Sequence, residues 1–188
     1  MLEMYNTNME TGVTVNTNKY QKGNWIDMVN PTEQEIKEVC ENVNIQEGFI
    51  RYALDFEEKA RIDAEEDDNT MLFIVDIPIK EREDDTLIYS TMPIGIIFVR
   101  DDYIITVSIK ENDIIQGMGK NNIKNIITYK KSRFLLQILY ANSSSYLNLL
   151  KKINKETEIA ESDLKNSMRN KELLKLLSLE KSLVYFTT

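Results

Sequence analysis

Three apolar runs in the middle of the chain have the composition of β-strands. Each is rich in β-branched and aromatic residues, and the turn-like polar segments KEREDD and RDD separate them. Short turns join antiparallel neighbours, so we expect a three-stranded meander at the centre of a sheet. The runs are TMLFIVDIPI (70–79), TLIYSTMPIGIIFV (86–99) and YIITVSI (103–109). Pro78 and Pro93 lack an amide donor, which places them at strand ends or bulges.

The N-terminal part predicts further strands. Alternating Thr, Val, Tyr and Asn residues around Gly12 favour a hairpin or two short strands before residue 25. The segment NWIDMV (24–29) predicts another strand, with Trp25 and Asp27 near its end. This strand leads directly into a helical pattern.

The helix that follows has two possible starts. Thr32 and Glu35 have the spacing of a capping box, and Asn30 before Pro31 is a competing cap. Apolar residues then recur at helical spacing, which predicts a buried stripe. The stripe is Ile36, Val39, Cys40 and Val43.

Helical patterns occur at four further places. A short helix is expected over 46–54, another over 112–120 with a glycine near its end as the cap, and a long amphipathic helix over 132–168. The last pattern begins near Asn170 and reaches Thr188 without a Gly, Asn or Pro stop signal, which predicts a sequence cut inside a helix of a longer protein. Its apolar positions are Leu173, Leu176, Leu177, Leu183, Val184 and Phe186.

Composition and charge exclude several classes of function. The 188 residues, 42% of them apolar, suffice for one globular domain with or without a helical extension. The formal net charge of −8 and the scattered lysines argue against nucleic acid binding. His is absent, which removes Ser-His-Asp and Cys-His catalysis and His-bearing zinc sites. Cys40 is the only cysteine, so no internal disulfide forms, and its helical spacing favours a core position.

Targeting signals and membrane spans are not indicated. The N-terminus lacks a basic start followed by an apolar segment. The longest apolar run, PIGIIFV, is far shorter than the roughly 20 residues that cross a bilayer. We therefore expect this stretch of chain to be soluble and intracellular.

Acidic residues are dense between 55 and 68, in DFEEKARIDAEEDD. Carboxylates are ligands of hard cations, but the spacing matches no EF-hand loop. We favour a solvated face or an edge strand that its charges protect from pairing. The pairs Asp84 and Asp85, and Asp101 and Asp102, lie in expected turns, where Asp is common. The sequence thus predicts no enzyme, no catalytic residue, no cofactor site and no metal site.

Several short motifs occur in an order that is known from one family. WID (25–27) precedes PTEQE (31–35), and FIVDIPI (73–79), STMPIGIIFVRDDYIITV (90–107) and a long Leu-rich helix (135–164) follow. In this order the chain resembles the cytosolic N-terminal domain of the CorA family of magnesium and cobalt transport proteins. The resemblance extends from Trp25 over nearly the whole chain, although each motif alone is weak.

The resemblance implies an α/β (α+β) fold, an αβα sandwich with a mixed, largely antiparallel sheet and long C-terminal helices. The sandwich core is expected over 1–130, and long helices packing on it over 131–188, before the family's stalk and transmembrane helices. Family members are homopentameric channels, so the resemblance implies a regulatory domain at the cytoplasmic face of the cell membrane, with Mg²⁺ or Co²⁺ as the transported ion. Contact with the membrane would occur only through segments absent from this sequence.

One position departs from the family pattern. In the family an adjacent Glu-Asp pair in the second helix contributes ligands to divalent ions held between subunits. The register from Trp25 puts Arg51 and Tyr52 there, and the long helix has Tyr140 and Ala141 in the corresponding region. A cation and a phenol do not replace two carboxylates around a hard dication, so no metal ligand carries over. The remaining, weak candidates are Asp55, Glu57 and Glu58.

Two alternative functions stay open at this level. Zinc-transporting relatives share the domain plan, and the lack of His disfavours zinc handling only within this domain. A free-standing acidic α/β module whose long helices bind a partner is the other. The missing helix stop signal counts against it.

Overall fold

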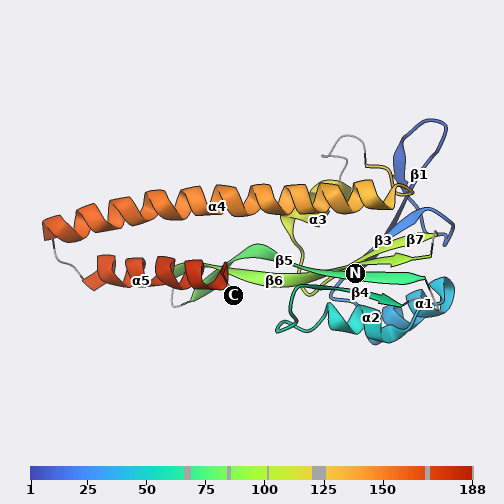
Figure 1. Ribbon diagram of the computed structural model, residues 1–188, viewed down its shortest axis with the longest axis horizontal. Helices are drawn as coiled ribbons and strands as arrows, with labels where there is room; N and C mark the ends of the chain where they lie inside the picture. The colour runs from blue at the N-terminus through green and yellow to red at the C-terminus, as the bar shows by residue number, and fades with distance from the viewer. Residues whose placement is uncertain (66–68, 84–85, 101, 120–125, 168–169, 188) are drawn as a thin grey trace. The chain divides into compact units, whose positions relative to one another are not determined.

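The computed structural model describes residues 1–65, 69–83, 86–100, 102–119, 126–167 and 170–187 (Figure 1). Within them the chain forms seven strands and five helices. The strands are β1 (Leu2–Thr7), β2 (Thr14–Asn16), β3 (Asn24–Val29), β4 (Arg61–Glu65), β5 (Thr70–Glu83), β6 (Thr86–Val99) and β7 (Tyr103–Ser108). The helices are α1 (Glu33–Val43), α2 (Glu47–Tyr52), α3 (Asp113–Gly119), α4 (Lys131–Ser167) and α5 (Asn170–Tyr185).

All seven described strands belong to one sheet, in the order β2-β1-β3-β7-β6-β5-β4. β3 runs antiparallel to β1 and parallel to β7, whereas the β1–β2, β4–β5 and β6–β7 pairs are antiparallel. The consecutive strands β5, β6 and β7 are neighbours, as expected of the meander. The prediction of a mixed, largely antiparallel sheet is confirmed.

The described chain divides into two compact units. The first comprises 1–76 and 93–139, and the second comprises 77–92 and 140–188. Each unit combines segments that are distant in sequence. The division expected from the sequence, a sandwich core over 1–130 and long helices over 131–188, follows secondary structure rather than these compact units, and it stays a prediction.

Helices cover both faces of the sheet in the first unit. Successive residues of β3 point to opposite faces. Ile26 belongs to the core shared with α1 and α2, which includes Ile36, Val39 and Ile50. On the other face Trp25 meets Phe134 of α4, with ring centroids 5.1 Å apart. This layering confirms the αβα sandwich.

The start of α1 follows the first of the two predicted caps. Thr32 accepts a hydrogen bond from the Glu35 amide at 3.2 Å, and the Glu35 carboxylate accepts one from the Thr32 amide at 2.8 Å. Asn30 instead adopts a positive φ of 43° in the link from β3. The helix buries the predicted stripe, Ile36, Val39, Cys40 and Val43.

α2 approaches the sheet closely because β6 has a glycine beneath it. A Cβ at Gly95 would lie 2.5 Å from the Cβ of Ala53, the residue that ends α2. Ala53 is fully buried at this contact. A hydrogen in place of a side chain therefore sets the distance between α2 and the sheet.

The acidic segment near residue 60 forms an edge strand, as predicted. β4 is last in the sheet order and carries Arg61, Asp63 and Glu65 at alternate positions. Charged side chains on an edge strand oppose pairing with another chain. The expectation of an edge strand is confirmed for Arg61–Glu65.

The expectation that Pro78 and Pro93 lie at strand ends was wrong, and the alternative that they mark bulges stays a prediction. Pro78 lies within β5 and Pro93 within β6, rather than at the end of either strand. The described pairing of β4 with β5 extends only as far as Ile74, and that of β7 with β6 begins at Ile94. Pro78 thus lies past the described pairing of β5 with β4, and Pro93 lies before the described pairing of β6 with β7, so the missing amides break no ladder in these described pairings.

The second unit has a small core of its own. It contains Tyr89 of β6, Leu149 and Ile153 of α4, and Leu179 of α5. α5 turns its small residues inward, since Ser178 and Ser182 are buried. Three of the four leucines that predicted this helix, together with a valine, are instead exposed: Leu173, Leu177, Leu183 and Val184.

Candidate functional site

The corner between α1 and α2 holds the first of the residues that the sequence singled out. The Arg51 guanidinium donates two hydrogen bonds to the Glu33 carboxylate, at 3.1 Å from Nη1 and 2.6 Å from Nη2. It donates two more to Glu47, at 3.2 Å from Nε and 2.8 Å from Nη2. Arg51 therefore joins two carboxylates, one from the start of each helix.

These bonds shift the pKa values of Arg51 and Glu33. Hydrogen bonds to Glu33 and Glu47 raise the pKa of Arg51, and the hydrogen bond from Arg51, followed by its charge, lowers the pKa of Glu33. The lowered pKa favours the ionised form of Glu33, which already faces a cation. Because the three groups are exposed, the ion pairs add little to stability. A divalent ion at this corner would meet the positive charge of Arg51.

Tyr52 and the three acidic candidates lie beside this corner. Arg61 places its guanidinium 4.9 Å from the Tyr52 ring centroid and pairs with Glu58 and, at 2.6 Å, with Asp63. Asp55 accepts a hydrogen bond from the backbone amide two residues on, which closes a turn. Glu57 is exposed. Among the described residues, no three acidic or Cys side chains are grouped in a way that could hold a metal ion.

Cys40, Asp102 and Tyr140, which were also considered from the sequence, lie in the described part of the chain. Cys40 is buried in the core, and burial raises the pKa of its thiol to about 11, as expected of a core cysteine. Asp102 pairs with Lys22 at 2.9 Å. Asp84, Asp85 and Asp101 lie outside the described residues. Tyr140 on α4 is 77% exposed.

Sequence reasoning missed a buried polar chain in the first unit. Trp25 Nε1 donates to Thr106 Oγ1 at 2.8 Å, and that hydroxyl donates to Asp27 Oδ1 at 2.7 Å. Asp27 lies inside β3 and is only 6% exposed, so the expectation that Trp25 and Asp27 lie near the strand end was wrong. Burial raises the pKa of Asp27 to about 6, although the hydrogen bond from Thr106 opposes this. The negative charge of Glu3, which stands opposite Asp27 on β1, raises the pKa further. An Asp inside a strand buried on both faces was the available signal.

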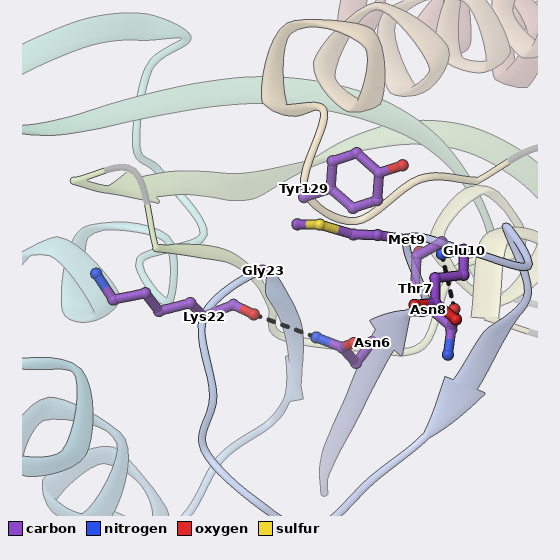
Figure 2. Close-up of a pocket in the computed structure, with 8 residues that line it drawn as sticks. All are labelled: Asn6, Thr7, Asn8, Met9, Glu10, Lys22, Gly23 and Tyr129. Carbon is purple, nitrogen blue, oxygen red and sulfur yellow. Dashed lines mark hydrogen bonds between the residues drawn. The ribbon is translucent and has the colours of Figure 1, made fainter.

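A polar hollow of about 400 Å³ lies near the N-terminal hairpin (Figure 2). Asn6 donates to the Lys22 carbonyl at 3.4 Å and to Asn24 at 2.8 Å, and Asn8 accepts the Glu10 amide at 2.8 Å. These bonds close loops within the chain. Glu10 and Lys22 are the charged members of the described lining, and the ammonium of Lys22 is paired outside it. The hollow offers no cluster of groups for catalysis.

Comparison with known proteins identifies relatives of this chain. A family model described as CorA-like Mg²⁺ transporter protein matches residues 20–188. The cobalt/magnesium transport protein CorA of Methanocaldococcus jannaschii is 28% identical over 171 residues, which is 86% of this chain and 50% of that protein. The chain thus spans about half the length of that curated relative.

Solved structures of these relatives share the fold. The soluble domain of CorA from Methanocaldococcus jannaschii matches 99% of this chain and 73% of its own with a TM-score of 0.83 at 23% identity. The complete CorA magnesium transporter from the same organism gives 0.78 at 22% identity, over 99% of this chain and 58% of its own. The cytoplasmic domain of ZntB from Vibrio parahaemolyticus gives 0.66 at 14% identity, over 94% and 72%.

Within the described part of the chain, no helix combines the length and the apolarity needed to cross a bilayer. The family match covers most of the chain, and the αβα sandwich with its long C-terminal helices agrees with it. The chain belongs to the family of CorA-like Mg²⁺ transporter proteins.

Proposed function

We propose that this chain is the cytosolic regulatory domain of a divalent-cation channel that transports Mg²⁺ or Co²⁺. The observation that carries the proposal is the family match over residues 20–188. The curated relative, named as a cobalt/magnesium transport protein, supports the choice of ion. The whole protein would be a homopentamer, with this domain at the cytoplasmic face of the cell membrane.

The role of such a domain is conformational rather than chemical. The domain would form part of an interface between subunits that has two arrangements. Ions, or the state of the cell, would shift the equilibrium between them. No cofactor is required for this. The formal net charge of −8 supports a domain that has no nucleic acid partner.

Zinc is the second candidate ion. The fold similarity to the ZntB cytoplasmic domain, with a TM-score of 0.66, supports considering it. Residues of the pore, which are not in this sequence, choose the ion, so the cytosolic domain alone does not discriminate between the two. Uptake measurements must therefore include Zn²⁺.

The test begins with the gene that encodes this chain. Its reading frame beyond Thr188 should continue through a stalk into two apolar helices joined by Gly-Met-Asn. The full-length protein, expressed in cells that lack their own Mg²⁺ uptake, should restore growth at low Mg²⁺, and Co²⁺ should compete more strongly than Zn²⁺. A stop codon after Thr188 would contradict the proposal and favour a free-standing interaction module.

Regulation by metal at the α1–α2 corner is not part of the proposal, because Arg51 occupies it with Glu33 and Glu47. Titration with low-millimolar Mg²⁺ should leave the melting temperature of the chain without a saturable rise, since stabilisation requires binding to the folded state. The variant Arg51→Glu/Tyr52→Asp, which adds two carboxylates to the corner, is the positive control and should gain such a rise. A saturable rise in the unaltered chain would contradict the assignment.

A further inference from the structure

A stripe of polar side chains crosses three neighbouring strands on the α4 face of the sheet. Asp27 of β3 points to this face, since it is two residues from Trp25, which meets α4. Glu3 of β1 stands opposite Asp27 in the register, and Thr106 of β7 stands opposite it on the other side. The stripe therefore brings two carboxyl groups together inside the first compact unit.

These two carboxyl groups face each other across an antiparallel pair of strands. Side chains directly opposite in such a pair have Cβ atoms about 5 Å apart, and like charges there oppose the pairing. Asp27 is only 6% exposed, so water screens little of the repulsion. Tyr5 donates to Glu3 Oε2 at 2.5 Å, and burial, followed by this bond, raises the pKa of Tyr5, which keeps its proton. The hydroxyl donors of the stripe thus leave the repulsion between the two carboxylates in place.

Charged groups on neighbouring elements act on Asp27 in both directions. Burial is the largest influence and raises the pKa of Asp27 to about 6, and the charges of Glu3 and of Glu111, which follows β7, raise it as well. The Thr106 hydrogen bond and the N-terminal ammonium lower it. That ammonium lies 3.5 Å from the Glu35 carboxylate, so its charge already has a partner. Proton uptake by Asp27 removes both the buried charge and the repulsion.

β1 is the strand whose pairing this repulsion weakens. It lies between the short β2 and β3 in the sheet, so its separation from β3 would release the N-terminal hairpin alone. The Tyr5 ring stacks on Trp25 with centroids 4.8 Å apart, and Thr7 exchanges hydrogen bonds with Thr128 at 3.0 and 2.9 Å. Terminal elements of this kind open at a lower free energy than the whole chain.

We propose that Glu3 and Asp27 form a proton-binding site that controls the docking of β1. With a proton on Asp27, the pair carries one negative charge and β1 stays paired with β3. When Asp27 gives its proton to water, two opposed charges favour release of the hairpin, which uncovers one side of the Trp25 ring. Acidification would thus tighten the hairpin. The proposal does not depend on the transport function, because β1 precedes the residues that the family model matches.

The pKa of Asp27 sets the pH range of this response. It is about 6 with β1 docked, and release would return it toward its ordinary value of 3.8, so the docked strand binds more protons between these values. The equilibrium constant for opening therefore rises with pH up to about 6 and is level above it. From pH 5 to pH 7 the expected rise is about tenfold.

Hydrogen exchange followed by mass spectrometry measures this opening. After correction for the intrinsic exchange rate, the protection of β1 amides should be about tenfold lower at pH 7 than at pH 5. At both pH values β1 should be less protected than β7, which distinguishes release of the strand from unfolding of the whole chain. Acrylamide quenching of Trp25, the one tryptophan of the chain, should increase over the same range.

Two variants test the carboxyl groups separately. Asp27→Asn keeps an acceptor for Thr106 and should give β1 the same protection at pH 5 and pH 7. Glu3→Gln removes the opposing charge and should raise the protection of β1 at pH 7 several-fold. Glu10→Gln, at an exposed position after β1, is the control and should follow the unaltered chain. Equal protection of β1 and β7, a pH dependence that persists in Asp27→Asn, or no effect of Glu3→Gln would overturn the proposal.

Discussion

Asp27 is a carboxylate that the fold removes from water. It lies in β3, 6% exposed, and accepts one hydrogen bond from the Thr106 hydroxyl at 2.7 Å. The Glu3 carboxylate stands across from it on β1, and the charges of Glu111 and of the N-terminal ammonium also act on it. Burial outweighs the hydrogen bond and raises the pKa of Asp27 to about 6. The protonated form is therefore favoured below that pH.

The raised pKa of Asp27 predicts how stability depends on pH. The pKa is about 6 in the folded chain against an ordinary value of 3.8, so the folded state binds more protons between these two values. The contribution of Asp27 to the free energy of unfolding is fully present below pH 3.8 and is lost as the pH rises through about 6. The difference corresponds to roughly 3 kcal/mol.

Asp27→Asn should remove this loss, because the amide oxygen still accepts the Thr106 hydroxyl and carries no charge. Urea denaturation at pH values from about 4.5 to 7.5 should give the variant a flatter dependence and about 2 kcal/mol more stability at the upper end. Asp55→Asn, at an exposed position, is the control and should follow the unaltered chain. Equal pH dependence of Asp27→Asn and the unaltered chain would refute the assignment.

At the scale of elements, one glycine sets how α2 packs on the sheet. Gly95→Ala should destabilise the chain by about 1–3 kcal/mol, since the added Cβ would lie 2.5 Å from the Ala53 Cβ and overpacking displaces neighbours. Gly117→Ala is the matched control. A Cβ there meets nothing within 4 Å, and Ala is the better helix former, so that variant should be neutral or gain up to about 1 kcal/mol.

A double variant separates the clash from other effects of Gly95→Ala. Combining Ala53→Gly with Gly95→Ala removes the opposing methyl group, so the pair should be more stable than the sum of the single changes predicts. Urea denaturation of all four proteins provides the coupling energy. Strict additivity would mean that the close approach of Ala53 is not the cause of the destabilisation.

The contact of α5 with β6 depends on a serine. Ser182 is fully buried, and its Oγ accepts the Tyr89 amide at 2.9 Å. Ser182→Ala should cost about 1–3 kcal/mol, because that amide would lose its partner inside the protein. Ser178→Ala is the comparison: the Ser178 hydroxyl donates within α5, to the Lys175 carbonyl, so thermal unfolding should show the smaller loss there. Equal losses would contradict the role of the Tyr89 contact.

For the whole molecule, local rules predicted the elements well. The capping box of Thr32 and Glu35 marks the start of α1, and β-branched runs mark β5, β6 and β7. Edge protection of β4 also followed from charge alone. Each of these signals lies within a few residues of the element it specifies, so the local sequence is enough to predict that element.

Candidate sites were less accessible from the sequence. The register argument singled out Arg51, and the structure adds that it joins Glu33 and Glu47, which no spacing rule indicates. The burial of Asp27 beside Thr106 depends on which strands become neighbours. These neighbours are distant along the chain.

The amino-acid sequence by itself determined the order and type of the elements, the absence of His-based chemistry, and the resemblance that the family match later confirmed. Only the tertiary structure decided the parallel pairing of β3 with β7, the inward turn of Ser178 and Ser182 in place of the α5 leucines, and the path of the prolines through β5 and β6. The physical reason is one of range. Capping, turn formation and strand propensity act between near neighbours, whereas burial and pairing depend on residues such as Asp27 and Thr106, which are 79 positions apart.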